Sequence, residues 1–469
     1  KEDIMRPFSM RDKLGYTLGD LGCCCTEQFR AMYLSVFYTL ILQVNPFHIG
    51  ILMLITKIWD AVNDPIIGAI VDSRKATKGG KFIPWIRAFS FPMAVLCILG
   101  FVNVSNLAYG LRLAYMFVTY VLYEALYTCV NVPFGTLSSV MTDDVRHRTA
   151  LSRYRSLGGT IFMTVIVMVG PLVLYVDNKP VAGRFLMLAS VFALIGLLCL
   201  QITCVWCKER VAVPERPKGE KLNYLHVIKE IAKNKALLGV MFFSLVGMIG
   251  ASVVNGLNTY LFKDYFGNVK IMAVSGGLSV LYSLITFAIT QPLADKLGKK
   301  EWCCWGAGFA AAVFALLFFF PIHNPVLFIV INGVCYLGAS GMQVLIWAMV
   351  NDSIDYHELQ TGERNEGIVY STYSFFRKLA SAVSGSLSSF VLGFIGYNVA
   401  EGAVQTAEVS NAIWKSYTGI YVLGYGVAVA ILFFVYPLTK AKTTEMLEQL
   451  KARRAEKASA VETDGEQCP

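Results

Sequence analysis

The sequence has little charge: only 16% of its 469 residues are Asp, Glu, Lys or Arg, whereas 55% are hydrophobic. A soluble domain of this length would need far more charge to cover its surface. The apolar residues form long blocks separated by short polar breaks that contain Gly and Pro, which is typical of a chain that crosses a membrane repeatedly. The composition therefore predicts an all-α integral membrane protein.

Groups that carry enzyme chemistry are also scarce. The five His residues are scattered along the chain. No zinc-protease motif, nucleophile elbow or phosphate-binding glycine loop is present. The twelve Cys residues lie mostly inside apolar blocks, where they act as small hydrophobes, and Cys204 and Cys207 lack the second ligand pair of a structural metal site. We therefore expect no catalysis, no cofactor and no metal apart from a transported Na⁺. Residues 1–13 lack the apolar core of a signal peptide.

About 20 apolar residues are needed to cross the hydrocarbon. The apolar blocks predict twelve transmembrane helices at 14–42, 47–72, 83–104, 107–139, 152–177, 184–207, 236–262, 271–294, 302–320, 325–350, 366–396 and 414–437. Most of the 41 Lys and Arg residues fall on one side of these spans, in the two terminal segments and in loops such as 208–235. Because positive loops stay in the cytoplasm, both termini are predicted to be cytoplasmic and the protein to lie in the cell membrane. The net charge of +9 reflects this bias, so we expect no nucleic-acid partner.

The longest polar break divides the chain into two halves. The predicted parts are a six-helix bundle at 1–207, a linker at 208–235, a second six-helix bundle at 236–437 and a cytoplasmic tail at 438–469. Asp72-Ser-Arg74 with Gly79-Gly80-Lys81 in the first half recurs as Asp295-Lys-Leu-Gly298-Lys299-Lys300 in the second. A repeated loop of this kind resembles the major facilitator superfamily, in which two six-helix bundles surround a central cavity.

Ionisable residues interrupt the second predicted span. Lys57, Asp60 and Asp64 are spaced so that they share one helix face. Asp60 lies roughly 18 Å from the cytoplasmic end of the helix, near the membrane midplane. Two carboxylates one turn apart repel each other unless a proton or a cation joins them, which favours a coupling site. A structural lock, in which Lys57 neutralises one carboxylate, is the alternative.

Other polar groups lie at similar depth. Lys378 either pairs with the carboxylates of the second span or packs with its amine turned toward the membrane–water interface. Asp20, Glu27 and Arg30 in the first span either line a cavity or form an internal ion pair. Asn131 precedes a proline by two residues, so the loosened helix there is either a site for sugar hydroxyls or a packing kink.

Several motifs carry a family resemblance. They are Trp59-Asp60-Ala-Val-Asn63-Asp64-Pro65-x-x-Gly68, Gly80-Lys81-Phe82-x-Pro84-Trp85, Asn131-Val-Pro-Phe-Gly135, Asp352-x-x-Asp355-Tyr356-x-Glu358 and Thr361-Gly362-x-Arg364-x-Glu366-Gly367, followed by Tyr370-Ser371 and Arg377-Lys378. Together they resemble the glycoside–pentoside–hexuronide cation symporters, over about Leu14 to Tyr436.

The resemblance implies Na⁺- or H⁺-driven sugar uptake by alternating access. It implies a cation site formed by Asp60, Asp64, Asn63, Thr128 and Lys378. It also implies sugar contacts from Asn131 and Arg155, to which we add Asp20, Tyr127, Trp347 and Tyr373 as candidate substrate-binding residues. A cytoplasmic charge network is implied for Arg146, Arg148, Asp352, Asp355, Arg364 and Glu366.

Three departures from the family bear on the substrate. The melibiose permease branch has sugar-binding Asp residues where this chain has Cys24 and Asn131, and a Trp where it has Gly135. Loss of carboxylates beside a retained Arg155 favours an anionic sugar. We therefore expect a small sugar or glycoside, preferably a hexuronide, carried by a functional monomer among membrane lipids. A symporter of a lipid-like solute and a transport-inactive sensor on the same scaffold remain the alternatives.

Overall fold

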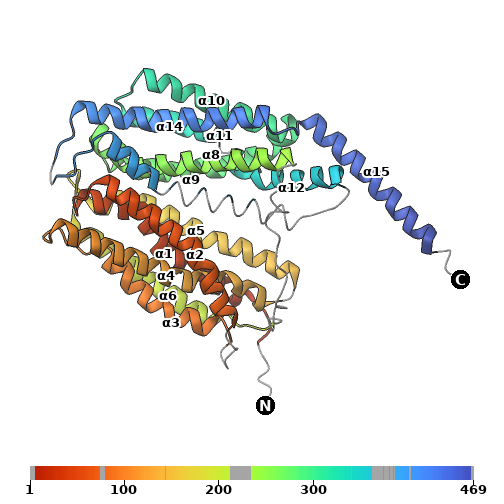
Figure 1. The fold of residues 1–469 in the computed structure, drawn as a ribbon, viewed down its shortest axis with the longest axis horizontal. Helices are drawn as coiled ribbons and strands as arrows, with labels where there is room; N and C mark the ends of the chain where they lie inside the picture. Colours follow the sequence, from red (N-terminus) through yellow and green to blue (C-terminus); the bar gives the residue numbers. More distant parts are fainter. Residues whose placement is uncertain are drawn as a thin grey trace, which may run out of the picture. The chain divides into compact units, whose positions relative to one another are not determined.

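A computed structural model of the chain describes residues 6–73, 80–142, 144–211, 234–339, 341–361, 386–400 and 403–465, with 373, 376, 380 and 384 as single positions between. The fold is almost entirely helical (Figure 1). Each predicted span except the eleventh, 366–396, coincides with a described helix. Most of that eleventh span lies outside the described residues.

The first half of the chain forms six helices. They are α1 (Met10–Leu40), α2 (Pro46–Ser73), α3 (Ile83–Leu99), α4 (Tyr109–Met141), α5 (Val145–Leu174) and α6 (Ala182–Trp206). The two-residue strands β1 (Tyr175–Val176) and β2 (Lys179–Pro180) pair as an antiparallel hairpin between α5 and α6. Helix α5 begins several residues before its predicted start at 152, because the basic segment after Val145 continues the helix rather than forming a loop.

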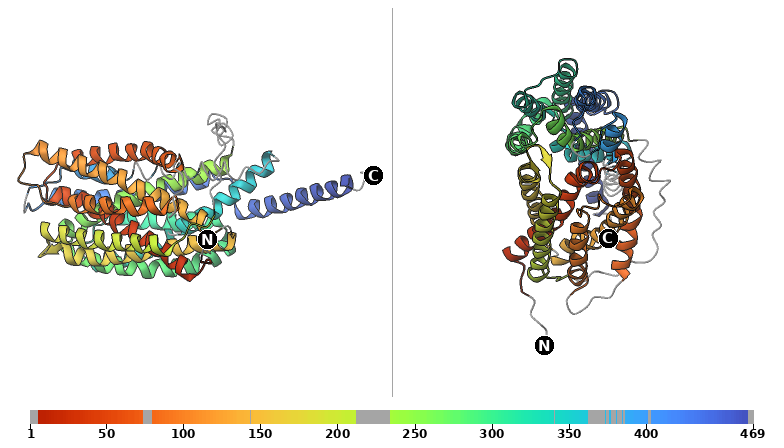
Figure 2. Two further views of the ribbon diagram at one scale, coloured as in Figure 1. Left: turned by 90° about the horizontal axis from the view of Figure 1, so that it is seen from below. Right: turned by 90° about the vertical axis from the view of Figure 1, so that its left-hand side faces the viewer.

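The second half contains α8 (Lys235–Tyr260), the π-helical turn η1 (Leu261–Tyr265), α9 (Ile271–Leu297), α10 (Lys299–Phe319), α11 (Pro325–Ala339), α12 (Gly341–Thr361), α14 (Ala407–Phe434) and α15 (Lys440–Gly465). The tenth predicted span, 325–350, corresponds to α11 and α12 and is longer than expected. Helix α15 projects from the other helices of its unit (Figure 2), as expected for a solvated helix. Its cytoplasmic location stays a prediction. It is fastened at its start, where Met446 and Leu450 are buried.

The described helices have the length and composition of membrane spans. Six are long and apolar enough to cross a membrane, or seven if the bent pair Ile271–Thr286 and Ala288–Leu297 forms one span. Apolar side chains such as Leu198 on α6 and Leu284 on α9 are more than half exposed, as expected for surfaces that face lipid. The chain is therefore a multi-pass membrane protein.

Close helix packing shapes the first bundle. Gly22 on α1 and Gly196 on α6 face each other so closely that a Cβ on either would lie 2.8 Å from the carbonyl oxygen of the other. Such small-residue contacts let helix backbones approach in a membrane, where apolar burial between helices contributes little. This crossing holds α1 at a fixed rotation, which directs its polar residues toward α2, α4 and α5.

Two compact units make up the chain. The first comprises Lys1–Pro217, Asn255–Gly277 and Gly385–Ile413, and the second comprises Lys218–Val254, Leu278–Ser384 and Trp414–Pro469. Within the first unit, Asn178 in the β-hairpin donates from Nδ2 to the Lys263 carbonyl at 2.9 Å and accepts from the Val269 N–H at 2.9 Å. Segments from the second half of the sequence therefore pack on the first six helices. The division at 208–235 stays a prediction, because most of that linker lies outside the described residues.

Candidate functional site

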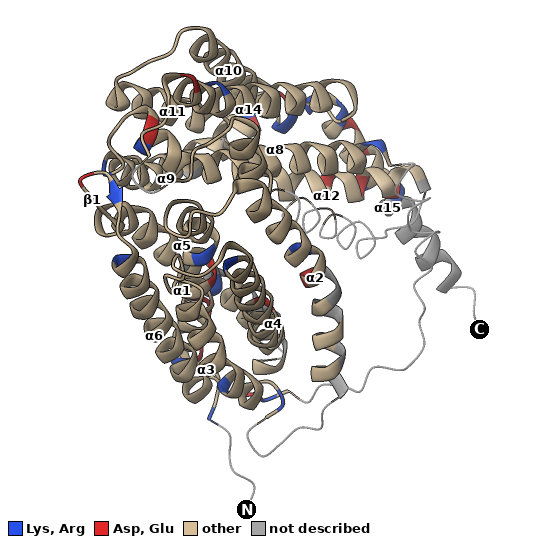
Figure 3. Cartoon of the chain, turned by 60° about the vertical axis from the view of Figure 1, so that its left-hand side comes forward, with Lys and Arg blue, Asp and Glu red and all other residues tan. Residues whose placement is uncertain are grey.

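A basic and an acidic residue interrupt the apolar course of α2 (Figure 3). Lys57 Nζ lies 3.2 Å from Asp60 Oδ2, as the spacing of three residues predicts. Asn63, one turn further along, is buried at 5% exposure. The Asp64 side chain lies outside the described part of the structure, so its predicted role stays a prediction.

Glu124 on α4 joins this pair, which the sequence analysis did not anticipate. Its Oε2 lies 4.0 Å from Lys57 Nζ, and its side chain is only 5% exposed. Thr128 lies one turn further along α4 and is also buried, at 4% exposure. A carboxylate inside the predicted span 107–139 was the signal that could have identified Glu124, because an ionisable group in an apolar helix needs a partner.

Helix α1 contributes two more charges to this region. Glu27 lies within electrostatic range of Glu124, Lys57, Arg30 and Asp60. Arg30 is 2% exposed and stacks over the Tyr123 ring, with 3.7 Å between its guanidinium carbon and the ring centroid. Its three side-chain nitrogens form no hydrogen bonds with described residues. Of the two alternatives for this helix, an ion pair between Glu27 and Arg30 is not what the described contacts show.

Asp20 and Arg155 form a second polar centre, between α1 and α5. Arg155 Nε donates to Asp20 Oδ1 at 3.0 Å, and the Gly159 N–H donates to Asp20 Oδ2 at 3.0 Å. Cys24 Sγ donates weakly to Oδ2 of the same carboxylate at 3.8 Å. A carboxylate is thus present beside Arg155, one helical turn before Cys24.

The polar residues of α4 lie along the same helix. Tyr127 stacks on Tyr123 with 6.0 Å between ring centroids, and both Tyr127 and Asn131 are half-buried. The helix runs without a break from Tyr109 to Met141, so Pro133 does not end it. Both interpretations of Asn131, as a sugar site and as a packing kink, stay predictions.

The second unit contains a hollow of about 340 Å³ lined by α8 and α12 together with Tyr373. Trp347 and Tyr373 meet edge to face there at 5.0 Å between ring centroids. The Tyr373 hydroxyl lies 3.0 Å from Ser244 Oγ. The described residues of the lining also include Met and Gly but no charged group. Of the predicted substrate-binding residues, Trp347 and Tyr373 are therefore brought together. Lys378 lies outside the described residues.

The predicted cytoplasmic charge network is described in part. Lys299 Nζ donates to both carboxylate oxygens of Asp352, at 2.7 Å each. Lys299 belongs to the repeated loop motif after the eighth span, so that motif reaches α12. Asp355 is half-buried. The side chains of Arg146 and Arg148, and all of Arg364 and Glu366, lie outside the described part of the chain.

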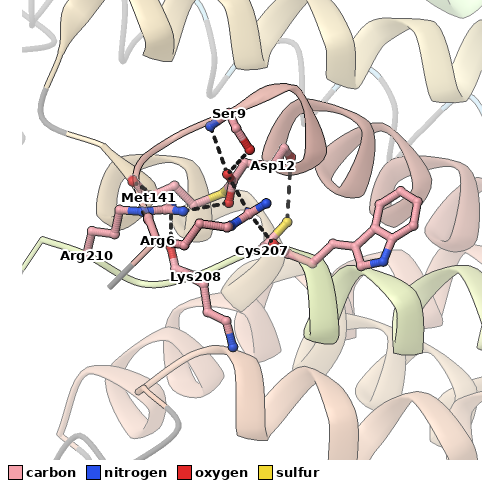
Figure 4. A network of polar contacts seen from close by, with 8 residues as sticks. Arg6, Ser9, Asp12, Met141, Cys207, Lys208 and Arg210 are labelled. Atoms are coloured by element: carbon pink, nitrogen blue, oxygen red, sulfur yellow. Dashed lines mark hydrogen bonds and ion pairs between the residues drawn. The ribbon is translucent and has the colours of Figure 1, made fainter. Parts of the chain in front are cut away.

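The start of the inter-bundle linker is fastened to the first unit. Arg210 and Arg6 both contact the fully buried Asp12, at 2.9 and 2.7 Å (Figure 4). The adjacent Glu209 accepts hydrogen bonds of 2.8 Å from the backbone N–H groups of Lys81, Phe82 and Ile83 at the start of α3. These contacts satisfy N–H groups that a helix start leaves unpaired.

Cys204 and Cys207 belong to the same end of the bundle. Cys207 Sγ donates weakly to the Asp12 carbonyl at 3.7 Å (Figure 4). Cys204 Sγ donates to the Ile83 carbonyl at 3.7 Å. Burial raises the pKa of the Cys207 thiol to about 12. In the described ranges, no group of three or more His, Cys, Asp or Glu could hold a metal. The two thiols act as buried packing groups.

Comparison with known proteins places these features in a family. The pattern described as MFS/sugar transport protein matches residues 15–440. The chain is 31% identical over 447 residues to the uncharacterized symporter YjmB of Bacillus subtilis, covering 94% of this chain and 95% of that protein. It is 29% identical to the isoprimeverose transporter of Lactiplantibacillus pentosus, covering 96% and 93%. It is 25% identical to the glucuronide carrier protein homolog of Escherichia coli, covering 95% and 96%.

Solved structures share the fold at low sequence identity. A D-xylose-proton symporter matches with a TM-score of 0.57 and 15% identity, over 91% of this chain and 98% of that one. A bacterial homolog of the human lysosomal transporter Spinster, in an inward-facing conformation, matches with a TM-score of 0.62 and 11% identity, over 94% and 97%. The architecture is that of a major facilitator transporter.

Proposed function

Because the chain belongs to the MFS/sugar transport protein family, we propose that it carries a glycoside, preferably a hexuronide, across the cell membrane together with Na⁺ or H⁺. Its relatives are named as symporters and sugar carriers, so it is a transporter and not an enzyme. The coupling ion, the hexuronide preference and the mechanism of alternating access are the proposed part.

The observation that carries the coupling proposal is the Lys57–Asp60 contact inside α2. Its 3.2 Å separation places a base and an acid together within an apolar helix, where charge is expensive unless it has a function or a partner. A cation that binds Asp60 must compete with Lys57, which makes the site responsive to the presence of Na⁺ or H⁺. Asn63, Thr128, Asp64 and Lys378 are proposed to complete the site.

Candidate substrate-binding residues are proposed within each unit, taken by itself. Arg155, whose side chain is 39% exposed, keeps surface available beyond its contact with Asp20. A guanidinium suits the carboxylate of a hexuronide because it donates in a planar fork. The hollow beside Trp347 and Tyr373 falls in the size range of small-molecule pockets and offers ring faces to the apolar side of a sugar. The Asn131 amide and the Tyr127 hydroxyl are proposed as hydrogen-bond partners for the hydroxyl groups of the sugar.

The proposed setting is the cell membrane, with both termini in the cytoplasm. Most Lys and Arg residues lie in the loops and tails assigned to that side. A single chain among membrane lipids is proposed as the functional unit. No further protein partner is required by the proposed cycle.

Uptake by proteoliposomes tests the proposal. A panel of neutral and acidic p-nitrophenyl glycosides is offered with an inward Na⁺ gradient, an inward H⁺ gradient, or neither. We expect concentrative uptake with one gradient, stronger for the acidic compounds. Asp60→Asn should abolish accumulation, whereas Glu448→Gln, at an exposed carboxylate of α15, should not. Uptake that neither gradient stimulates, or accumulation that survives Asp60→Asn, would show the coupling proposal to be wrong.

A further inference from the structure

One amine in the first unit lies between two carboxylates on different helices. Lys57 Nζ is 3.2 Å from Asp60 on its own helix α2 and 4.0 Å from Glu124 on α4. Side-chain exposure is 25% for Lys57, 19% for Asp60 and 5% for Glu124. The flexible four-carbon stem of a lysine can therefore move its ammonium from one acid to the other by side-chain rotation alone.

The surroundings leave Glu124 few other ways to compensate its charge. Glu27 of α1 is a further acid within electrostatic range and adds to the repulsion. Arg30 of α1 is held over the Tyr123 ring at 3.7 Å and lies 5.0 Å above the Tyr120 ring. Its guanidinium charge is thus directed at aromatic faces of α4 rather than hydrogen-bonded to the acids.

The charged and titratable groups of this cluster come from four packed helices. Those that the structure describes are Glu27, Arg30 and Tyr38 of α1, Lys57 and Asp60 of α2, Cys97 of α3, and Tyr120, Tyr123, Glu124 and Tyr127 of α4. Among the described residues, three carboxylates thus share two bases, Lys57 and Arg30. A pure structural lock would match one acid to one base, since an unpaired buried charge strongly destabilises a fold.

We infer that Lys57 is a mobile counter-ion that exchanges between Asp60 and Glu124, and that Glu124 is the positioning residue that receives it when a cation occupies Asp60. The inference rests on the proposed symport function. The arriving cation replaces the ammonium at Asp60, and the displaced ammonium neutralises Glu124. No covalent bond changes. Cation affinity is then set partly by how well Glu124 accepts Lys57.

The exchange predicts the direction of each substitution. Glu124→Gln removes the second acceptor, so Lys57 stays on Asp60 and competes harder with the cation. We expect about 10-fold weaker Na⁺ affinity or, if protons are the coupling ion, a binding midpoint about one pH unit lower. Lys57→Met removes the competitor and should tighten cation binding. With Lys57→Met already present, Glu124→Gln should change the midpoint by less than about 2-fold.

Purified full-length protein is titrated with Na⁺ at constant pH, with choline as the balancing ion, and separately over pH without Na⁺. Thermal stabilisation gives the midpoint, because a ligand of the native state raises the melting temperature. Glu124→Asp keeps a shortened carboxylate and should give a smaller shift than Glu124→Gln. The starting melting temperature of each variant separates loss of fold from loss of affinity.

The outcomes separate this inference from the function on which it rests. If the unmodified protein responds to neither Na⁺ nor pH, the symport proposal fails first. If it responds but Glu124→Gln leaves the midpoint unchanged, the exchange is wrong and the symport proposal stands. If Glu124→Gln shifts the binding midpoint equally with Lys57 and with Lys57→Met, Glu124 acts through its own electrostatic field. That result also contradicts the exchange.

Discussion

Asp20 and Arg155 lie 3.0 Å apart, as carboxylate oxygen and guanidinium Nε, across the contact between α1 and α5. The other carboxylate oxygen of Asp20 accepts the Gly159 N–H at 3.0 Å. Asp20 is therefore held by two donors of α5 and compensates the positive charge of Arg155. If Arg155 binds an anionic sugar as proposed, the sugar has to share or replace this carboxylate, so we propose the pair as a determinant of substrate charge.

Asp20→Asn should move the preference toward acidic substrates. The amide cannot neutralise Arg155, so the guanidinium attracts a substrate carboxylate more strongly. The affinity for p-nitrophenyl glucuronide relative to p-nitrophenyl glucoside should rise about 10-fold, and Arg155→Gln should lower glucuronide affinity roughly 10- to 100-fold. Competition binding measures both ratios, with Glu448→Gln as the control. An unchanged ratio in Asp20→Asn would place substrate-charge recognition elsewhere.

Local patterns predicted more of this site than long-range patterns did. The Lys57–Asp60 contact follows from helical spacing alone, and the apolar blocks fixed the helix positions because membrane spans need continuous apolar length. The role of Cys204 and Cys207 as buried hydrophobes also followed from their apolar surroundings. In each case the relevant physics acts within one helix.

Contacts between helices were the part that the sequence could not provide. Glu124 meets Lys57 only because α2 and α4 pack in one rotation, and the Arg30–Tyr123 stacking depends on the rotation of α1. Lys299 reaches Asp352 across 53 positions of the chain. Hydrophobic periodicity tells which residues can lie in a membrane, but it does not set the relative rotation of two neighbouring helices.

Glu209→Gln should destabilise the first unit. The Glu209 carboxylate accepts three backbone N–H groups at 2.8 Å at the start of α3, where a negative charge also interacts favourably with the helix dipole. The glutamine amide has one acceptor oxygen and no charge, so we expect the free energy of unfolding to fall by about 1–3 kcal/mol.

Thermal unfolding of the purified protein measures this loss as a lower melting temperature. Glu448→Gln makes the same chemical change at an exposed position of α15 and should alter stability by less than about 0.5 kcal/mol. Equal melting temperatures for the two variants would mean that water replaces the Glu209 contacts without cost.

Cys207 should resist thiol reagents as long as the protein is folded. Burial is the main cause that raises the pKa of its thiol to about 12, and the neighbouring Asp12 acts in the same direction. At pH 8 only about one thiol in 10⁴ is then the reactive thiolate, and reactivity should increase as the pH rises toward 12.

The test uses a variant in which Cys207 is the single cysteine, treated with maleimide at pH 8 before and after denaturation. Glu448→Cys in a cysteine-free background provides the exposed comparison and should label at once. If Cys207 labels as fast as this control in the folded protein, the linker start is not held against Asp12 as the structure has it.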